Sequence, residues 1–140
     1  MQNILNFIKK NGISESFVTG FIDETDGVKK FHPYYYIFYI KSGNKLFKVS
    51  INEKDLSIVI AEGKIECCFD IDEDDEFCFS SIHEHLFKCE DAVRVDDIYT
   101  KRERFEKLVI EYSYGQNLKG ILIADPLNFF GFTFHNDEVL

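Results

Sequence analysis

The chain has 140 residues, of which 45% are hydrophobic and 16% aromatic, and its formal net charge is −9. This length fits a single domain, residues 1–140, whose core is large enough to fold without disulfides or metals, and the composition excludes a disordered chain. The negative charge would repel nucleic acid and attract basic molecules, so we expect a protein partner and no nucleic acid.

The beginning of the chain lacks the pattern of a secretory signal, because Lys9 and Lys10 follow its apolar residues instead of preceding them. No apolar run reaches the roughly 18 residues that a membrane-spanning helix needs. We therefore expect a cytoplasmic protein without membrane contact, whose cysteines are reduced.

Residues 3–11 are expected to form a short helix, because their apolar side chains share one face and Asn11-Gly12 supplies a left-handed stop. After this helix, runs of β-branched and aromatic residues alternate with turn residues, and such short separators predict an antiparallel meander. The run at 33–41 is apolar on both faces, which predicts either a central strand covered on both sides or a strand with an exposed aromatic face, and we expect a helix to cover part of it. The expected strands cover residues 16–23, 33–41, 45–52, 56–63, 64–71 and 76–82.

Residues 96–115 carry the strongest helical pattern, with Phe105, Leu108 and Tyr112 on an apolar stripe and Glu103 four residues before Lys107. A weaker helix or turn is expected within residues 80–90, and the apolar runs 120–125 and 129–135 read as a closing strand pair. The predicted fold class is therefore α+β. It consists of an antiparallel β-sheet of about six to eight strands, packed against an N-terminal helix and one long helix in the C-terminal half.

The stretch FDIDEDDEF, residues 69–77, holds six carboxylates in seven consecutive positions between two phenylalanines. Asp70, Asp72 and Asp74 have the spacing that opens an EF-hand calcium loop. The remainder of that loop does not fit, because Asp75 stands where a glycine is needed and Ser81 where a bidentate glutamate is needed. We therefore predict no metal here, and the stretch is either a solvated loop or a surface for a cationic partner.

His83, His85, Cys78 and Cys89 are possible zinc ligands, but no single helix or strand would place them on one face. Whether they meet in three dimensions is left open by the sequence. The chain contains no nucleophile motif and no glycine-rich phosphate loop, so we predict no cofactor, no catalytic residues and no enzymatic activity.

In size, acidity and architecture the chain resembles the immunity proteins of bacterial contact-dependent inhibition and polymorphic toxin systems. This resemblance implies a cytoplasmic protein that binds and neutralises a cognate toxin, often a basic nuclease. Local chemistry supplies the candidate residues: carboxylates that steer the partner and aromatic rings that anchor it. The steering set is Asp70, Asp72, Asp74, Asp75 and Glu76, and the anchors are Phe77, Tyr35 and Tyr39.

Two other classes of function fit the same composition. An acidic anti-defence protein that mimics nucleic acid would use the same carboxylates, spread along an extended face. A small ligand-binding domain or enzyme would need an aromatic-lined pocket that contains His83, His85 or a carboxylate.

Overall fold

The computed structural model describes residues 1–103, 105–128 and 131–139, and within them the protein is mainly β. Two helices are present in these residues, α1 (Gln2–Asn11) and α2 (His83–Phe87). The strands, in chain order, are β1 (Glu15–Thr25), β2 (Val28–Ser42), β3 (Lys45–Asn52), β4 (Ser57–Glu62), β5 (Glu76–Ser81), β6 (Arg94–Arg102), β7 (Glu106–Tyr114), β8 (Leu118–Asn128) and β9 (Gly131–Val139).

The predicted α+β fold with a long C-terminal-half helix is wrong, because the described residues of 96–115 contain two strands, β6 and β7, which pair antiparallel. The apolar stripe misled the prediction, since Leu108 and Tyr112 share one side of a strand as well as one face of a helix. Ile110, midway between them, is also fully buried, as the two-residue period of a strand requires. The Glu103 carboxylate does lie 3.7 Å from the Lys107 ammonium, but Lys107 belongs to β7 and not to a helix.

Several elements of the first half are confirmed. α1 forms where expected, and Gly12 follows it with a φ of 75°. β1 to β4 pair antiparallel in chain order. The expected strand at 64–71 is absent, since residues 63–75 contain no strand, and β5 pairs with β1 instead of β4.

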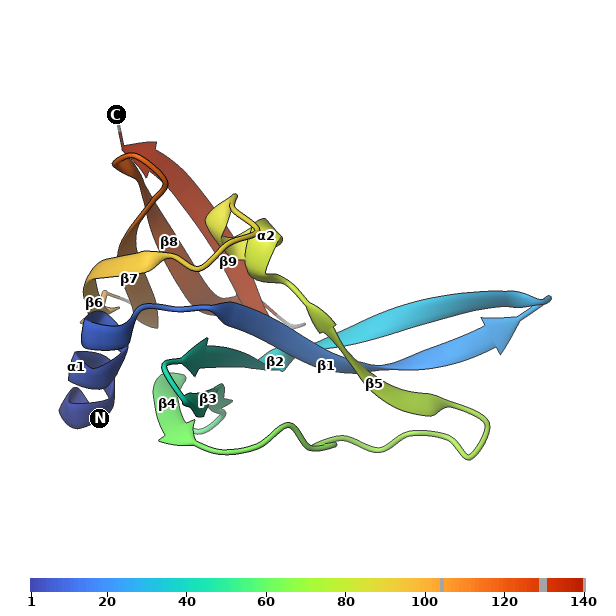
Figure 1. Ribbon diagram of the computed structural model, residues 1–140. Coiled ribbons are helices and arrows are strands. Elements are labelled where there is room, and N and C mark those ends of the chain that lie inside the picture. Colours follow the sequence, from blue (N-terminus) through green and yellow to red (C-terminus); the bar gives the residue numbers. More distant parts are fainter. Residues whose placement is uncertain (104, 129–130, 140) are drawn as a thin grey trace.

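The strands form two sheets, β5-β1-β2-β3-β4 and β6-β7-β8-β9, which together make a nearly closed, barrel-like body (Figure 1). The core lies between the two sheets. The Phe38 ring contacts Phe132 and Phe134, with ring centroids 5.0 and 5.2 Å apart. α1 packs against β6, and α2 adds the fully buried side chains of Leu86 and Phe87.

A break in β2 joins the two sheets. Val18 of β1 lies opposite Phe38, but Gly20 lies opposite Pro33, so residues 34–37 of β2 stand against a single residue of β1. At this break Tyr35 pairs in parallel with Gly131 of β9. The final run, predicted from residue 129, begins with two phenylalanines outside the described residues, and β9 supplies the rest of it.

Beyond the break, the β1–β2 hairpin continues as residues 20–33, which we call the arm. Figure 1 shows the arm projecting away from the body, with β5 and the segment 63–75 running beside it. The arm ends at Asp26-Gly27, both with positive φ, as a tight two-residue hairpin requires. A long two-stranded ribbon thus extends from a compact core.

The joint between the sheets depends on Gly131. Its φ is +104°, and a Cβ atom added there would overlap the backbone of Tyr35. Gly27 also has a positive φ, of +78°, but open space surrounds it. We predict that Gly27→Ala lowers the free energy of unfolding by about 1 kcal/mol through backbone strain alone. Gly131→Ala should lower the free energy of unfolding by at least about 2 kcal/mol more than Gly27→Ala does, because β2 and β9 must move apart.

Chemical denaturation of the two variants measures this difference directly. Equal losses of stability would show that the close contact between β2 and β9 does not hold the sheets together.

Candidate functional site

The six carboxylates of residues 70–76, which we call the acidic strip, lie at the end of segment 63–75 and at the start of β5. All are exposed except Asp75, which is partly buried. The Asp75 backbone N–H donates to the Asp72 carbonyl at 3.0 Å, so a turn reverses the chain within the strip. The acidic strip is therefore a surface loop beside the arm, as the solvated-loop and partner-surface interpretations both require.

The two phenylalanines that bracket the strip hold its ends in place. The Phe69 ring lies 4.7 Å from Tyr34 of β2 and 6.3 Å from Phe21 of β1, measured between ring centroids. Its centroid is 6.1 Å from that of Phe77, at the start of β5. These four rings, the aromatic cluster, fasten an otherwise irregular segment to the arm, because apolar rings gain most by leaving water together.

β1 adds two carboxylates that the sequence analysis missed. Asp23 and Glu24 line a small depression of about 90 Å³ together with Asp74, Glu76 and Lys29. The register explains this approach, since Ile22 of β1 lies directly opposite Glu76. No local pattern predicts it, because the two segments lie about fifty residues apart in the chain and meet only through the β1–β5 pairing.

The acidic strip gathers six carboxylates that form no ion pair within the described part of the chain, although Lys29 lines the same depression as Asp74 and Glu76. Among the described residues, no lysine, arginine or histidine forms an ion pair with residues 70–76. Elsewhere carboxylates do pair, as in Glu62 with Lys45 at 3.7 Å and Glu66 with Lys48 at 3.8 Å. The strip therefore concentrates uncompensated negative charge on one side of the molecule.

The proposed aromatic anchors occupy three different environments. Tyr39 is completely buried, and burial is the main cause that raises the pKa of its hydroxyl. Segment 63–75 covers this face of β2, where a helix was expected, so Tyr39 is not available to a partner. Tyr35 packs against the core, with its ring 6.3 Å from Phe134, and Phe77 is partly buried in the aromatic cluster.

Phe79 of β5 is the exposed aromatic that the sequence analysis did not single out. Its side chain is 53% exposed, and its ring makes an edge contact with Phe17 at 5.6 Å between centroids. The alternation along β5 could have indicated it, since Phe77 and Phe79 share one face of a strand and only the first reaches the aromatic cluster.

The possible zinc ligands do not converge. His83 is buried, His85 is exposed, and the Cys78 and Cys89 thiols are free. Across the described ranges 1–103, 105–128 and 131–139, no three such side chains come together in a way that could hold a metal ion. Burial, together with the charge of Glu76, raises the pKa of the Cys78 thiol, so this cysteine is a poor nucleophile.

His83 uses both ring nitrogens inside the protein. Nε2 lies 2.7 Å from the Asp91 carbonyl, which can only accept, so Nε2 carries the proton. Nδ1 then accepts a hydrogen bond from the Ser16 hydroxyl at 3.1 Å. Burial lowers the pKa of this imidazole, against the opposing effects of the Asp91 carbonyl and the nearby Glu15 and Asp91 charges. His83 therefore joins α2 to β1 and leaves no nitrogen for a substrate.

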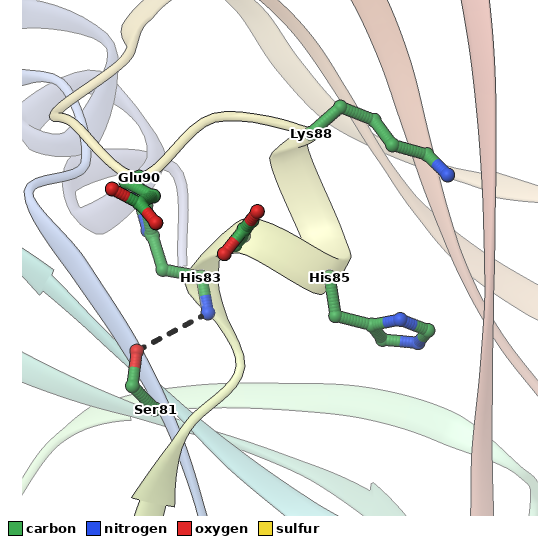
Figure 2. Close-up of a pocket in the computed structure, with 6 residues that line it drawn as sticks. Ser81, His83, His85, Lys88 and Glu90 are labelled. Atoms are coloured by element: carbon green, nitrogen blue, oxygen red, sulfur yellow. Dashed lines mark hydrogen bonds between the residues drawn. The ribbon is translucent and has the colours of Figure 1, made fainter.

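A cavity of about 810 Å³ lies beside α2 and is shown in Figure 2. It is lined by polar residues: Ser81, His83, Glu84, His85, Lys88 and Glu90. The His83 backbone N–H donates to Ser81 Oγ at 3.5 Å, while the His85 and Lys88 side chains point away from that contact (Figure 2). This cavity is therefore not the aromatic-lined pocket that a small ligand-binding domain would need.

His83 gives the fold a defined response to acid. Its folded-state pKa lies below the ordinary value of about 6.5, so the stability contributed by the neutral form is complete above that value. This stability is lost as the pH falls through the lowered pKa, with a slope approaching about 1.4 kcal/mol per pH unit between the two values. Wild type should therefore lose more stability between about pH 7.5 and about pH 5 than His83→Gln.

The exposed His85 provides the control, because His85→Gln makes the same substitution at an exposed position two residues away. Chemical denaturation at both pH values should show that His85→Gln loses as much stability between them as wild type does. If all three proteins show the same pH dependence, His83 is not held neutral by the fold.

Comparison of the chain with protein-family models, with curated proteins and with solved structures finds no match. No helix among the described residues is both long and apolar enough to cross a membrane.

Proposed function

We propose that the protein neutralises a cognate basic protein toxin, as an immunity protein does, by binding it through the acidic strip and the adjoining side of the arm. One observation carries this proposal. The six carboxylates of the acidic strip lie beside a projecting arm, and none of them forms an ion pair with a lysine, arginine or histidine among the described residues. Folding alone gains nothing from such a concentration, since like charges repel. A cationic binding partner would relieve that repulsion.

The chemistry favours a partner whose own function requires positive charge, such as a nuclease that holds phosphates. Carboxylates presented to such a cleft accelerate association by electrostatic steering, and an exposed ring can then slow dissociation. Phe79 is the better anchor than Tyr39, because Tyr39 is fully buried. Asp23 and Glu24 extend the steering set across to β1.

The alternatives have less support. A nucleic-acid mimic would carry unpaired charge along an extended face, whereas carboxylates outside the strip pair with lysines on several elements: Glu15 with Lys41, Glu62 with Lys45, Glu66 with Lys48 and Glu103 with Lys101. An enzyme would need reactive groups that converge in its cavity. Both ring nitrogens of His83 are already occupied by the protein, and the His85 side chain points away from the His83–Ser81 contact.

Co-expression with each protein encoded beside this gene tests the proposal, because one of these neighbours should be the toxin. The neighbour should be toxic alone, harmless with the wild-type chain, and recovered in a complex with it. Toxicity that persists although both proteins are soluble would contradict neutralisation of that neighbour.

The acidic strip should control the association rate. Asp72→Asn, Asp74→Asn and Asp75→Asn together keep the side-chain shape and remove three charges, so the fold should persist. Association measured by stopped flow should slow by about ten-fold or more in about 0.05 M salt, and the difference should shrink near about 0.5 M salt as screening increases.

A matched variant removes three charges from the C-terminal part of the chain, in and between the strands β6 to β9: Glu103→Gln, Glu111→Gln and Asp137→Asn. Net charge changes equally in both triple variants, so only a localised effect separates them. Equal association rates for the two triple variants at low salt would show that net charge, and not the acidic strip, attracts the partner.

A further inference from the structure

β5 is an edge strand with one unused side. It pairs with β1 through residues 76–81, and among the described residues no strand pairs with its other edge. The other outer strands carry contacts on their outer sides. The Ile58 N–H of β4 donates to Glu106 Oε1 at 2.8 Å, and α1 lies against β6 with Lys9 3.6 Å from Asp97. The β5 edge is therefore open where comparable edges are blocked.

The hydrogen-bond pattern identifies which β5 groups face outward. The Ile82 N–H donates to the Ser16 carbonyl at 2.9 Å, so residues 16 and 82 form a hydrogen-bonded pair. Antiparallel pairs alternate, which directs the backbone groups of Cys78 and Ser80 toward β1. The N–H and C=O groups of Phe77, Phe79 and Ser81 consequently face the open edge.

The side chains of β5 do not guard this edge. Edge strands that must stay unpaired commonly carry lysine, proline or a bulge. The β5 sequence EFCFSS contains neither lysine nor proline, and its register with β1 is continuous. Phe79 stands 53% exposed in the middle of the strand. The edge therefore has the properties of a strand-addition surface, where backbone groups supply affinity and side chains supply specificity.

The charges around β5 determine what kind of strand fits. The acidic strip precedes β5, and exposed Glu84 and Glu90 follow it beside α2. Carboxylates thus flank both ends of the open edge, with Lys88 as the nearby opposing charge. A second copy of the chain fits poorly, because self-pairing along β5 would bring the acidic strips and the Glu84 and Glu90 carboxylates of two copies toward one another.

We propose that the open edge of β5 receives an extended segment of the partner that carries lysine or arginine at both ends, by antiparallel or parallel strand addition. This proposal rests on the proposed function and specifies how the basic partner is held. The segment's backbone pairs with Phe77, Phe79 and Ser81, and its cationic side chains reach the flanking carboxylates.

Two variants at one position isolate the backbone contribution. Phe79→Pro removes the ring and the outward N–H, whereas Phe79→Ala removes the ring and keeps the N–H. Proline is tolerated at an edge position whose N–H is not used by the neighbouring strand, so the pairing with β1 should persist. Circular dichroism and thermal unfolding check that both variants fold alike.

The probe is a capped peptide of alternating lysine and valine, about nine residues long, together with an analogue N-methylated at every second residue. On wild type, the peptide should shift the backbone amide signals of Phe77, Phe79 and Ser81 in nuclear magnetic resonance spectra. Fluorescence anisotropy should show that wild type binds the N-methylated analogue at least about ten-fold more weakly than the unmodified peptide. Phe79→Pro should likewise bind the unmodified peptide at least about ten-fold more weakly than Phe79→Ala does. The comparison of the two peptides on wild type holds even if the proline variant is unstable.

The outcomes separate this proposal from the proposed function. If the two peptides bind wild type equally, and the acidic-strip triple variant weakens both, then charge attraction stands and strand addition is overturned. If the acidic-strip variant, the proline variant and N-methylation all leave binding unchanged, both proposals fall. Sedimentation of free wild type as a dimer, with Phe79→Pro a monomer, would assign the edge to a second copy and overturn the proposal.

Discussion

The architecture depends on β2, which pairs with three other strands. It pairs with β1 on both sides of its break, with β3 through residues 37–42, and at the break with β9 through Tyr35 and Gly131. Because residues 34–37 stand against one residue of β1, the direction of the hairpin changes there. The same break therefore joins the two sheets of the body and releases the arm from it.

The arm makes the acidic strip physically possible. Six carboxylates packed against a broad protein surface would be partly desolvated, whereas beside a thin ribbon they keep their hydration on most sides. The aromatic cluster supplies the apolar contacts that hold the segment in place, through the phenylalanines on either side of the strip. Charge for recognition and rings for attachment thus come from one continuous stretch, residues 69–77.

Local signals in the sequence predicted α1 and the antiparallel hairpins, because a glycine stop and short turns such as Asp26-Gly27 act within a few residues. The exposure of the acidic strip also followed from its composition. The β6–β7 hairpin was missed because Leu108 and Tyr112 satisfy helical and strand periods equally, and only the burial of Ile110 separates the two. The pairing of β1 with β5 joins residues about sixty positions apart, which no local pattern specifies, so the open edge of β5 and the burial of Tyr39 could not be predicted.

The most direct test of this account is the hydrogen-exchange footprint of the partner on the intact protein. The partner recovered by co-expression should slow exchange of backbone amides in residues 70–81 and leave the amides of β6 to β9 unchanged. Protection confined to β6 to β9, with residues 70–81 exchanging as in the free protein, would contradict recognition through the acidic strip and β5.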